Sequence, residues 1–433
     1  MGRQPAHPIR IAVLIAIGTR SIAGATEPAT LRLADLVSAA RAQNPRIAMA
    51  RARAQAAGAM PAQARAYDDP VVSWESWNFP DSGNVGRADN NIFRLSQKIP
   101  FPGKRTLAGE VARHDAEATD ADASMVELDV VAAVKRAYWD LWMRHQRALV
   151  YERERSIVER YARLTEQKYS LGEVPQPDVL RAQVEVTHAI NRTGTETIAI
   201  DAARAELNAL LSRAPDEPLG TPEDVTLPDR PEPLEALVEL AVAHRPEIAA
   251  QAAAIARETT AVHLAEKGYL PDFEVSVGRF VNHGTSDGFG AMASMTIPLA
   301  YRSKYEAGVS AASARLATVE ADRRRVLDAI HREVQQALLR VRTARLQRDI
   351  LTTTHLPQVE QALHVTEGAY QAGSVDFLAL VDTIRMIESA HLEHVEAEAD
   401  LGKAWADLER AVGTEVAASV RRPTHGKDGS HHD

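Results

Sequence analysis

The side chains that could support chemistry in this sequence are histidines, carboxylates and one glycine–lysine run. His391 and His394 are three positions apart and close to Glu388, so on a helix they would share a face suited to a metal ion. That spacing lacks a third fixed ligand, and an exposed polar face accounts equally for these residues. The run Pro102-Gly103-Lys104-Arg105-Thr106 resembles the end of a phosphate-binding loop, but Gln97 stands where such a loop needs its first glycine. We therefore expect a turn there.

No arrangement typical of an enzyme is present in the sequence. It contains neither Gly-x-Ser-x-Gly nor His-Glu-x-x-His, and no two carboxylates have the spacing of an acid–base couple. The absence of cysteine excludes disulfides, thiolate metal sites, thiol nucleophiles and lipidation on cysteine. We expect a protein that is not an enzyme and that holds no cofactor and no resident metal.

Charge and composition narrow the class of partner. The chain of 433 residues has 50 Lys and Arg against 59 Asp and Glu, a net charge of −9, whereas a nucleic-acid-binding surface needs a basic stripe. Aromatic residues make up 5% of the chain and apolar residues, many of them alanine, make up 45%. This composition favours close helix packing over an aromatic-rich sandwich. We therefore expect a largely helical protein with no nucleic-acid partner.

The first 25 residues have the organisation of an export signal. Arg3 and Arg10 give a positive start, Ile11 to Ile17 form a short apolar run, and Ala23-Gly24-Ala25 form a small-residue cleavage site. A start without fixed structure is the alternative interpretation. No later stretch reaches the ~20 uninterrupted apolar residues of a membrane helix, so any contact with a bilayer would be made by strands.

An internal repeat decides the organisation of the chain. Matching residues recur at a constant offset of 201 positions; the clearest pairs are Leu33 and Leu234, Pro45 and Pro246, Tyr169 and Tyr370, and Gly172 and Gly373. We divide the chain into a signal peptide at 1–25, a first repeat at 26–212, a linker rich in Pro and acidic residues at 213–230, a second repeat at 231–413, and a disordered His-containing tail at 414–433.

Each repeat contains two segments whose hydrophobicity alternates with a period of two residues. In one of them, Phe93 and Leu95 alternate with Arg94 and Ser96. We expect strands at 70–80 and 89–99 in the first repeat and at 272–282 and 287–298 in the second. Each segment has about ten residues, the length of a tilted strand that crosses a bilayer.

Long helical segments follow each strand pair. Between residues 106 and 169 there is no proline and one glycine, and Val130 and Val134 belong to an apolar stripe. At 1.5 Å per residue, such a helix would be roughly 100 Å long. Helical spacing resumes after Gly172 and Gly373. We expect antiparallel coiled-coil hairpins at 103–211 and 302–412, with their turns, here called the tips, at 170–178 and 371–379.

Four strands are too few to close a barrel within one chain. Open strand edges in lipid would leave backbone N–H and C=O groups unpaired. We therefore expect a mixed α/β membrane protein that forms a homotrimer, with a twelve-stranded β-barrel continued by an α-helical barrel. The alternative class is a soluble periplasmic coiled-coil scaffold, in which the alternating segments form a sandwich.

Three features together resemble the TolC family of outer-membrane efflux channels. They are the repeat, the run Gln97 to Arg105 between strand and helix, and the paired turns Tyr169-x-x-Gly172 and Tyr370-x-x-Gly373. The Pro-Phe-Pro-Gly-Lys-Arg part of that run resembles the subgroup that serves heavy-metal resistance pumps. The resemblance implies a trimer in the outer membrane of a Gram-negative bacterium, with its helical barrel in the periplasm. It would dock onto a periplasmic adaptor and an inner-membrane RND-type pump and conduct heavy-metal cations passively. Organic compounds or a secreted polypeptide are the alternative cargoes.

The resemblance also implies a gate at the tips. In the family, an aspartate on the first turn and a tyrosine on the second form a latch that holds the periplasmic end closed, and Asp178 and Tyr370 stand at those places. A second family latch needs an arginine where this chain has Val375. Of two pore-facing aspartates, Asp382 is retained, and three copies would favour the passage of cations. The alternative role of both aspartates is that of solvated carboxylates near helix N-termini.

Two further groups of residues are assigned to the ends of the molecule. The tip glycines Gly172 and Gly373 mark the sites at which the adaptor would dock. The aromatic residues of the first strand pair would form a belt at the surface of the outer-membrane lipid; they are Trp74, Trp77, Phe79 and Phe93. Ordinary strand packing is the alternative role of these aromatic residues.

Overall fold

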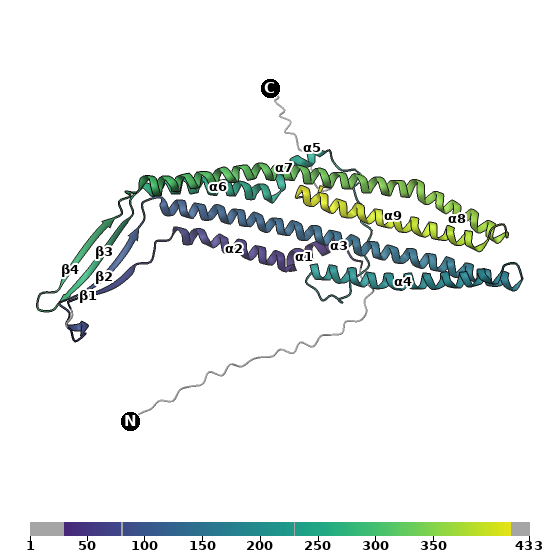
Figure 1. Ribbon diagram of the computed structural model, residues 1–433, viewed down its shortest axis with the longest axis horizontal. Helices are drawn as coiled ribbons and strands as arrows, with labels where there is room; N and C mark the ends of the chain where they lie inside the picture. The colour runs from purple at the N-terminus through teal and green to yellow at the C-terminus, as the bar shows by residue number, and fades with distance from the viewer. Residues whose placement is uncertain (1–29, 79–80, 229, 417–433) are drawn as a thin grey trace, which may run out of the picture.

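Long helices run side by side through most of the computed structural model, and a small sheet lies at one end (Figure 1). The structure describes residues 30–78, 81–228 and 230–416. The expected signal peptide at 1–25, Phe79 and the tail beyond residue 416 lie outside the described residues. None of the described helices is both long and apolar enough to cross a membrane.

The first repeat begins with two short helices separated by one extended residue. Its elements are α1 (Leu33–Gln43), α2 (Pro45–Arg65), β1 (Val71–Trp77), a 3₁₀ turn (Val85–Arg87), β2 (Asn90–Ile99), α3 (Lys104–Ser170) and α4 (Gln176–Leu210). Asn44 is extended, with ψ 125°, because Pro45 disfavours a helical residue before it. The Asn44 side chain caps α2 by accepting a hydrogen bond of 2.9 Å from the backbone N–H of Arg46. The helix α3 then continues for 67 residues.

The second repeat has the same order of elements but a divided long helix. Its elements are α5 (Leu234–His244), α6 (Pro246–Glu266), a 3₁₀ turn (Lys267–Tyr269), β3 (Phe273–Asn282), β4 (Gly288–Met295), α7 (Ala307–Ile350), α8 (Leu356–Gln371) and α9 (Phe377–Val412). Wider π-helical turns occupy Tyr301–Glu306 and Leu351–His355. Pro357 has no N–H to donate to the carbonyl of Thr353, so the helix loosens ahead of the proline. The hydrophobic period did not predict this difference between the repeats.

One antiparallel sheet joins the two repeats in the order β1-β2-β3-β4. β2 pairs with β3 along their whole length, from Asn90 opposite Asn282 to Ile99 opposite Phe273. Among the described strands, β1 pairs only with β2 and β4 only with β3, so both outer edges are open. The duplicated hairpins and the four strands confirm the predicted architecture of the chain.

The helices of the two repeats pack directly against each other, with α3 in contact with α2, α4, α6 and α9. Tyr138 and Leu141 of α3 belong to a buried cluster that also includes residues of α4 and α9. The approach of α9 to α3 is close at Gly402, where an added Cβ would lie 2.1 Å from the Trp139 ring. A separate buried cluster lies near the tips and includes Tyr370. The core therefore continues along the molecule as far as the predicted gate.

Candidate gate at the helix turns

The two turns that close the hairpins lie at the end of the molecule opposite the sheet (Figure 1). They have the same backbone geometry, with φ +74° at both Gly172 and Gly373. The N–H of Glu173 donates to the carbonyl of Lys168 and that of Ser374 to the carbonyl of Ala369, both at 2.9 Å. This is the left-handed helix ending that favours glycine, because a Cβ is strained at such a φ. The repeated tyrosine–glycine spacing therefore encodes one turn twice.

The hydroxyl of Tyr370 joins the two hairpins at this end. Tyr370 is buried, and its Oη lies 2.7 Å from Oγ1 of Thr165 on α3. Thr165 donates its single proton to the carbonyl of Tyr161 at 2.8 Å, so Tyr370 is the donor in the bond between the hydroxyls. Burial, together with the nearby charge of Asp178, raises the pKa of Tyr370 despite its hydrogen bond with Thr165. Tyr370 therefore acts as a neutral hydrogen-bond donor.

Lys168 of α3 makes a second contact between the hairpins. Its Nζ lies 3.2 Å from each of the carbonyl oxygens of Tyr370 and Gln371. These carbonyls belong to the last turn of α8 and lack partners within that helix. The ammonium group also lies 5.3 Å from the centre of the Tyr370 ring. The first hairpin thus caps a helix of the second.

Asp178 lies beside this group, and its contact within the protomer is with Arg181 rather than with Tyr370. It is buried in the first turn of α4, and its Oδ1 is 3.5 Å from Nη1 of Arg181. Its charge acts on Tyr370, but the Tyr370 hydroxyl is bonded to Thr165 instead. The structure therefore brings the two latch residues to the same end of the protomer and gives the tyrosine a different partner. Sequence reasoning missed Thr165, whose distance along the chain from Tyr370 left no local signal.

Asp382 is an exposed carboxylate on α9. Its side chain is 64% exposed, and its nearest cation is Arg385, at 4.0 Å. Arg385 contacts Glu185 of α4 more closely. Asp382 is therefore available to solvent in the protomer, as a pore-lining carboxylate must be, and its position in the pore stays a prediction.

Ion pairs connect the two hairpins further from the tips. Besides the contact of Arg385 with Glu185, Nη1 of Arg192 on α4 lies 3.1 Å from Oε1 of Glu388 on α9. Both glutamates are buried, so solvent screens these pairs only weakly. We call these two contacts the inter-hairpin pairs. The sequence does not reveal them because local periodicity does not determine how one helix is shifted along another.

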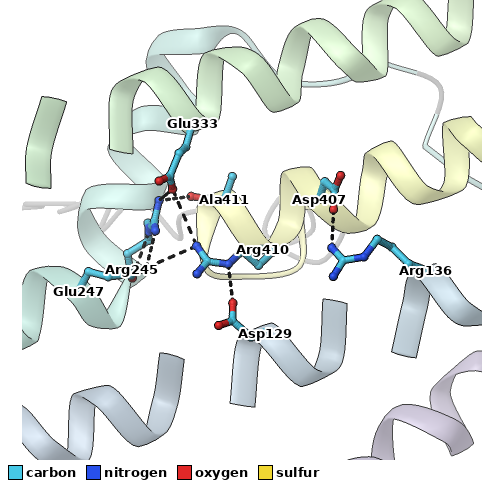
Figure 2. A network of polar contacts seen from close by, with 8 residues as sticks. All are labelled: Asp129, Arg136, Arg245, Glu247, Glu333, Asp407, Arg410 and Ala411. Atoms are coloured by element: carbon cyan, nitrogen blue, oxygen red, sulfur yellow. Dashed lines mark hydrogen bonds and ion pairs between the residues drawn. The ribbon is translucent and has the colours of Figure 1, made fainter. Parts of the chain in front are cut away.

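A larger ionic network ties the two repeats together (Figure 2). The Arg245 side chain is 4% exposed; it contacts Glu247, and its Nη1 lies 2.6 Å from Oε2 of Glu333 on α7. Nε of Arg410 on α9 lies 2.8 Å from Oδ1 of Asp129 on α3. Burial alone would raise the pKa of Glu247, but hydrogen bonding to Arg245 and its charge outweigh burial and hold this pKa below its usual value. The network joins four helices of both repeats.

The sheet divides the predicted aromatic belt between its two faces. Trp74 and Phe93 are opposite each other in the β1–β2 register, and their rings stack with centroids 6.4 Å apart. Trp77 is three residues from Trp74 in the same strand, so its side chain points to the opposite face. All three are exposed in the protomer. Trp74 and Phe93 can therefore belong to one belt, whereas Trp77 lies on the other face of the sheet because of its odd spacing, and the belt itself stays a prediction.

The histidines of α9 do not form a metal centre with their neighbours. Nε2 of His394 lies 3.0 Å from Oγ1 of Thr352, and burial lowers the pKa of His391, which favours its neutral form. Within residues 30–78, 81–228 and 230–416, no group of three or more His, Cys, Asp or Glu residues is arranged to hold a metal ion.

Duplicated helical hairpins, a four-stranded sheet with open edges and paired turns at the opposite end together define an outer-membrane channel protein. The chain belongs to the outer membrane efflux protein family, whose model matches residues 36–213 and 237–414. Each match falls on one of the two repeats, which confirms the resemblance to the TolC family.

Known relatives share the fold along most of the chain. The cobalt-zinc-cadmium resistance protein CzcC of Cupriavidus metallidurans is 22% identical over 352 residues, which cover 81% of this chain and 82% of that protein. The solved structure of VceC from Vibrio cholerae has a TM-score of 0.73 at 18% identity and covers 89% of this chain and 96% of its own. The solved structure of CusC has a TM-score of 0.74 at 15% identity and covers 91% of this chain and 96% of its own.

Proposed function

We propose that three copies of this chain form one channel, with a twelve-stranded barrel in the outer membrane and a helical barrel in the periplasm. The open edges of the sheet are the observation on which this proposal depends. β1 and β4 run in opposite directions, because each neighbouring pair in the sheet is antiparallel. The β4 edge of one copy can therefore pair with the β1 edge of the next, and three such junctions would leave no strand edge exposed to lipid.

Exposed apolar side chains on the helices and on the sheet support the same assembly. Leu339, Leu346 and Ile350 are spaced by seven and four residues on α7, and each is at least half exposed. That spacing forms the seam through which helices pair in a coiled coil. On the sheet, Trp74, Phe93 and Val277 belong to an exposed apolar face that would meet lipid.

We infer that the channel conducts heavy-metal cations passively, as the outer-membrane part of a tripartite system with a periplasmic adaptor and an inner-membrane RND-type pump. The matched relative CzcC is named for resistance to cobalt, zinc and cadmium. Three copies of Asp382 around the axis would raise the local concentration of cations. Tyr370, bonded to Thr165 and beside the charge of Asp178, would hold the closed end, and the turns at Gly172 and Gly373 would contact the adaptor.

A deletion strain tests the cargo. Restoring the gene should restore growth in cobalt, zinc or cadmium, and the strain should not differ from its parent in tolerance of organic antibiotics. A strain whose antibiotic tolerance alone depends on the gene would show that organic compounds are the cargo. The protein should also require detergent for extraction and should sediment as a trimer. Recovery in the soluble periplasmic fraction would contradict the channel.

The variant Asp382→Asn tests the selectivity of the pore. We expect the reversal potential in a salt gradient across a planar bilayer to shift toward zero, because the ring of three carboxylates is lost. Asp407→Asn is a matched control, since Asp407 also lies on α9 but is paired with Arg136 at 2.7 Å. An unchanged reversal potential in Asp382→Asn would exclude Asp382 from the narrow part of the pore.

A further inference from the structure

Two buried glutamates, each from a different hairpin, lie among the packed helices, and the charge of one acts on the other. Glu154 of α3 is 2% exposed and Glu388 of α9 is 6% exposed. They belong to different repeats, so the interface between the two hairpins passes between them. Glu388 is held by Arg192 of α4, with 3.1 Å between Nη1 and Oε1.

The charges around Glu154 do not balance. Oε2 of Glu154 is buried and has no hydrogen-bond partner. The charges that act on Glu154 are Glu388 from α9, Arg192 from α4 and Arg153 from its own helix. Arg192 is already paired with Glu388, and Arg153 is exposed to solvent. Among the described residues, no cation lies within ion-pair distance of the Glu154 carboxyl.

This position favours the protonated form of the carboxyl. A buried carboxylate without a bonded cation loses its hydration, and the two arginines that act on Glu154 from a distance compensate for only part of that loss. Burial, and next the charge of Glu388, raise the pKa of Glu154 to about 7. Burial also raises the pKa of Glu388, which Arg192 and Arg385 oppose and Glu185 reinforces.

We propose that Glu154 is a proton-binding site that controls how tightly the two hairpins close, so that the channel opens more readily as the pH rises. This inference rests on the proposed channel function. When Glu154 is neutral, α3 and α9 pack together over it. When it ionises, its charge is hydrated only if the hairpins separate, and separation is also the movement that widens the tips.

The direction and size of the effect follow from proton linkage. The closed state binds the proton with a pKa of about 7, and a hydrated Glu154 in the open state would have the usual value of 4.5. The proton therefore stabilises the closed state at low pH, and this stabilisation is lost as the pH rises through 7. With these two values, the opening equilibrium of each protomer increases about tenfold between roughly pH 6 and 8.

The variant Glu154→Gln tests the proposal, because glutamine has the shape of the protonated acid and cannot ionise. In planar bilayers, the opening equilibrium per protomer of the wild-type protein should rise about tenfold from roughly pH 6 to 8, whereas Glu154→Gln should show no such rise and should open less readily than the wild type at both pH values. Glu152→Gln, on the exposed side of the same turn, is the matched control and should behave as wild type. A normal pH response in Glu154→Gln would overturn the proposal.

A second measurement separates this proposal from the channel itself. Amide hydrogen exchange of α9 in the purified protein, corrected for the intrinsic effect of pH, should show more frequent opening at pH 8 than at pH 6 in the wild type but not in Glu154→Gln. The variant Glu388→Gln should move the midpoint to lower pH, because it removes the repelling charge. Failure to form channels at any pH would refute the proposed function alone. Identical exchange profiles in wild type and Glu154→Gln would refute the proton site alone.

Discussion

Substitutions of Arg245 can separate two contributions to the stability of the protein. One comes from the charge of the side chain, and the other comes from the capping position that this residue occupies between α5 and α6. Arg245 is the extended residue between α5 and Pro246, the first residue of α6; Figure 2 shows its contacts. The corresponding residue of the first repeat, Asn44, occupies the same position without a charge. Its side chain accepts from the N–H of Arg46 at 2.9 Å and donates to the carbonyl of Leu210 at 2.8 Å. Asparagine at position 245 would therefore add a helix cap that the Arg245 side chain does not provide, but would not replace the ion pairs.

The magnitudes follow from the burial of the partners. Removing one member of a buried ion pair costs about 3–5 kcal/mol. Glu333 is 42% exposed, and Arg410 remains 3.4 Å from Glu247, so some compensation is present. We therefore expect Arg245→Ala to lower the free energy of unfolding by about 3 kcal/mol. The added helix cap contributes about 1 kcal/mol, so Arg245→Asn should cost about 2 kcal/mol.

The assay is guanidinium denaturation of the detergent-solubilised protein, followed by tryptophan fluorescence. The exposed Arg46 beside Asn44 provides the control, and Arg46→Ala should change the free energy of unfolding by less than about 0.5 kcal/mol. Arg245 holds the pKa of Glu247 below 4.5. The stabilisation that this ion pair gives the folded protein is therefore present above pH 4.5 and is lost as the pH falls through the pKa that Glu247 has in the folded state. The difference between wild type and Arg245→Ala should therefore shrink in acid. Equal losses in the Ala and Asn variants would refute the capping argument, and no loss in either would refute the role of the network.

Three other substitutions test the packing and the turns. Gly402→Ala should destabilise the protein by about 1–3 kcal/mol, because the new Cβ would overlap the Trp139 ring. A smaller loss of stability, measured by denaturation, would mean that α9 shifts freely to make room for the methyl group. Gly373→Ala should cost about 1–2 kcal/mol through its φ of +74°, whereas Gly308→Ala, in a helix with open space around it, should be neutral or stabilising. Thr165→Val removes the acceptor of the Tyr370 hydroxyl, so single-channel conductance should rise; an unchanged value would show that this hydrogen bond does not hold the gate.

The fold could be predicted to a large extent because its signals are local. Alternation of Phe93 and Leu95 with Arg94 and Ser96 indicates a strand, and the offset between Gly172 and Gly373 indicates that one hairpin occurs twice. The break before Pro45 also follows from a local steric rule.

The candidate site was less accessible to prediction because it depends on the relative position of distant helices. The bond between Thr165 and Tyr370, and the contact of Arg385 with Glu185, each join residues about two hundred positions apart. An apolar stripe determines which side of a helix faces the core, but not its axial shift against a neighbour. The face on which Trp77 lies, in contrast, could have been predicted from the sequence. Trp77 is three residues from Trp74, and an odd spacing places two residues of one strand on opposite faces of the sheet.

The π-helical turn at Leu351–His355 makes the two halves of a duplicated sequence mechanically unequal. In the first half, α3 is one continuous helix, which resists bending along its length. In the second half, α7 and α8 are separated by this turn, where a backbone hydrogen bond is missing before Pro357, so the turn can act as a hinge. A force applied to the turn at Gly373 would therefore bend the helix at the π-helical turn. The same force applied at Gly172 would be transmitted along α3 toward the sheet.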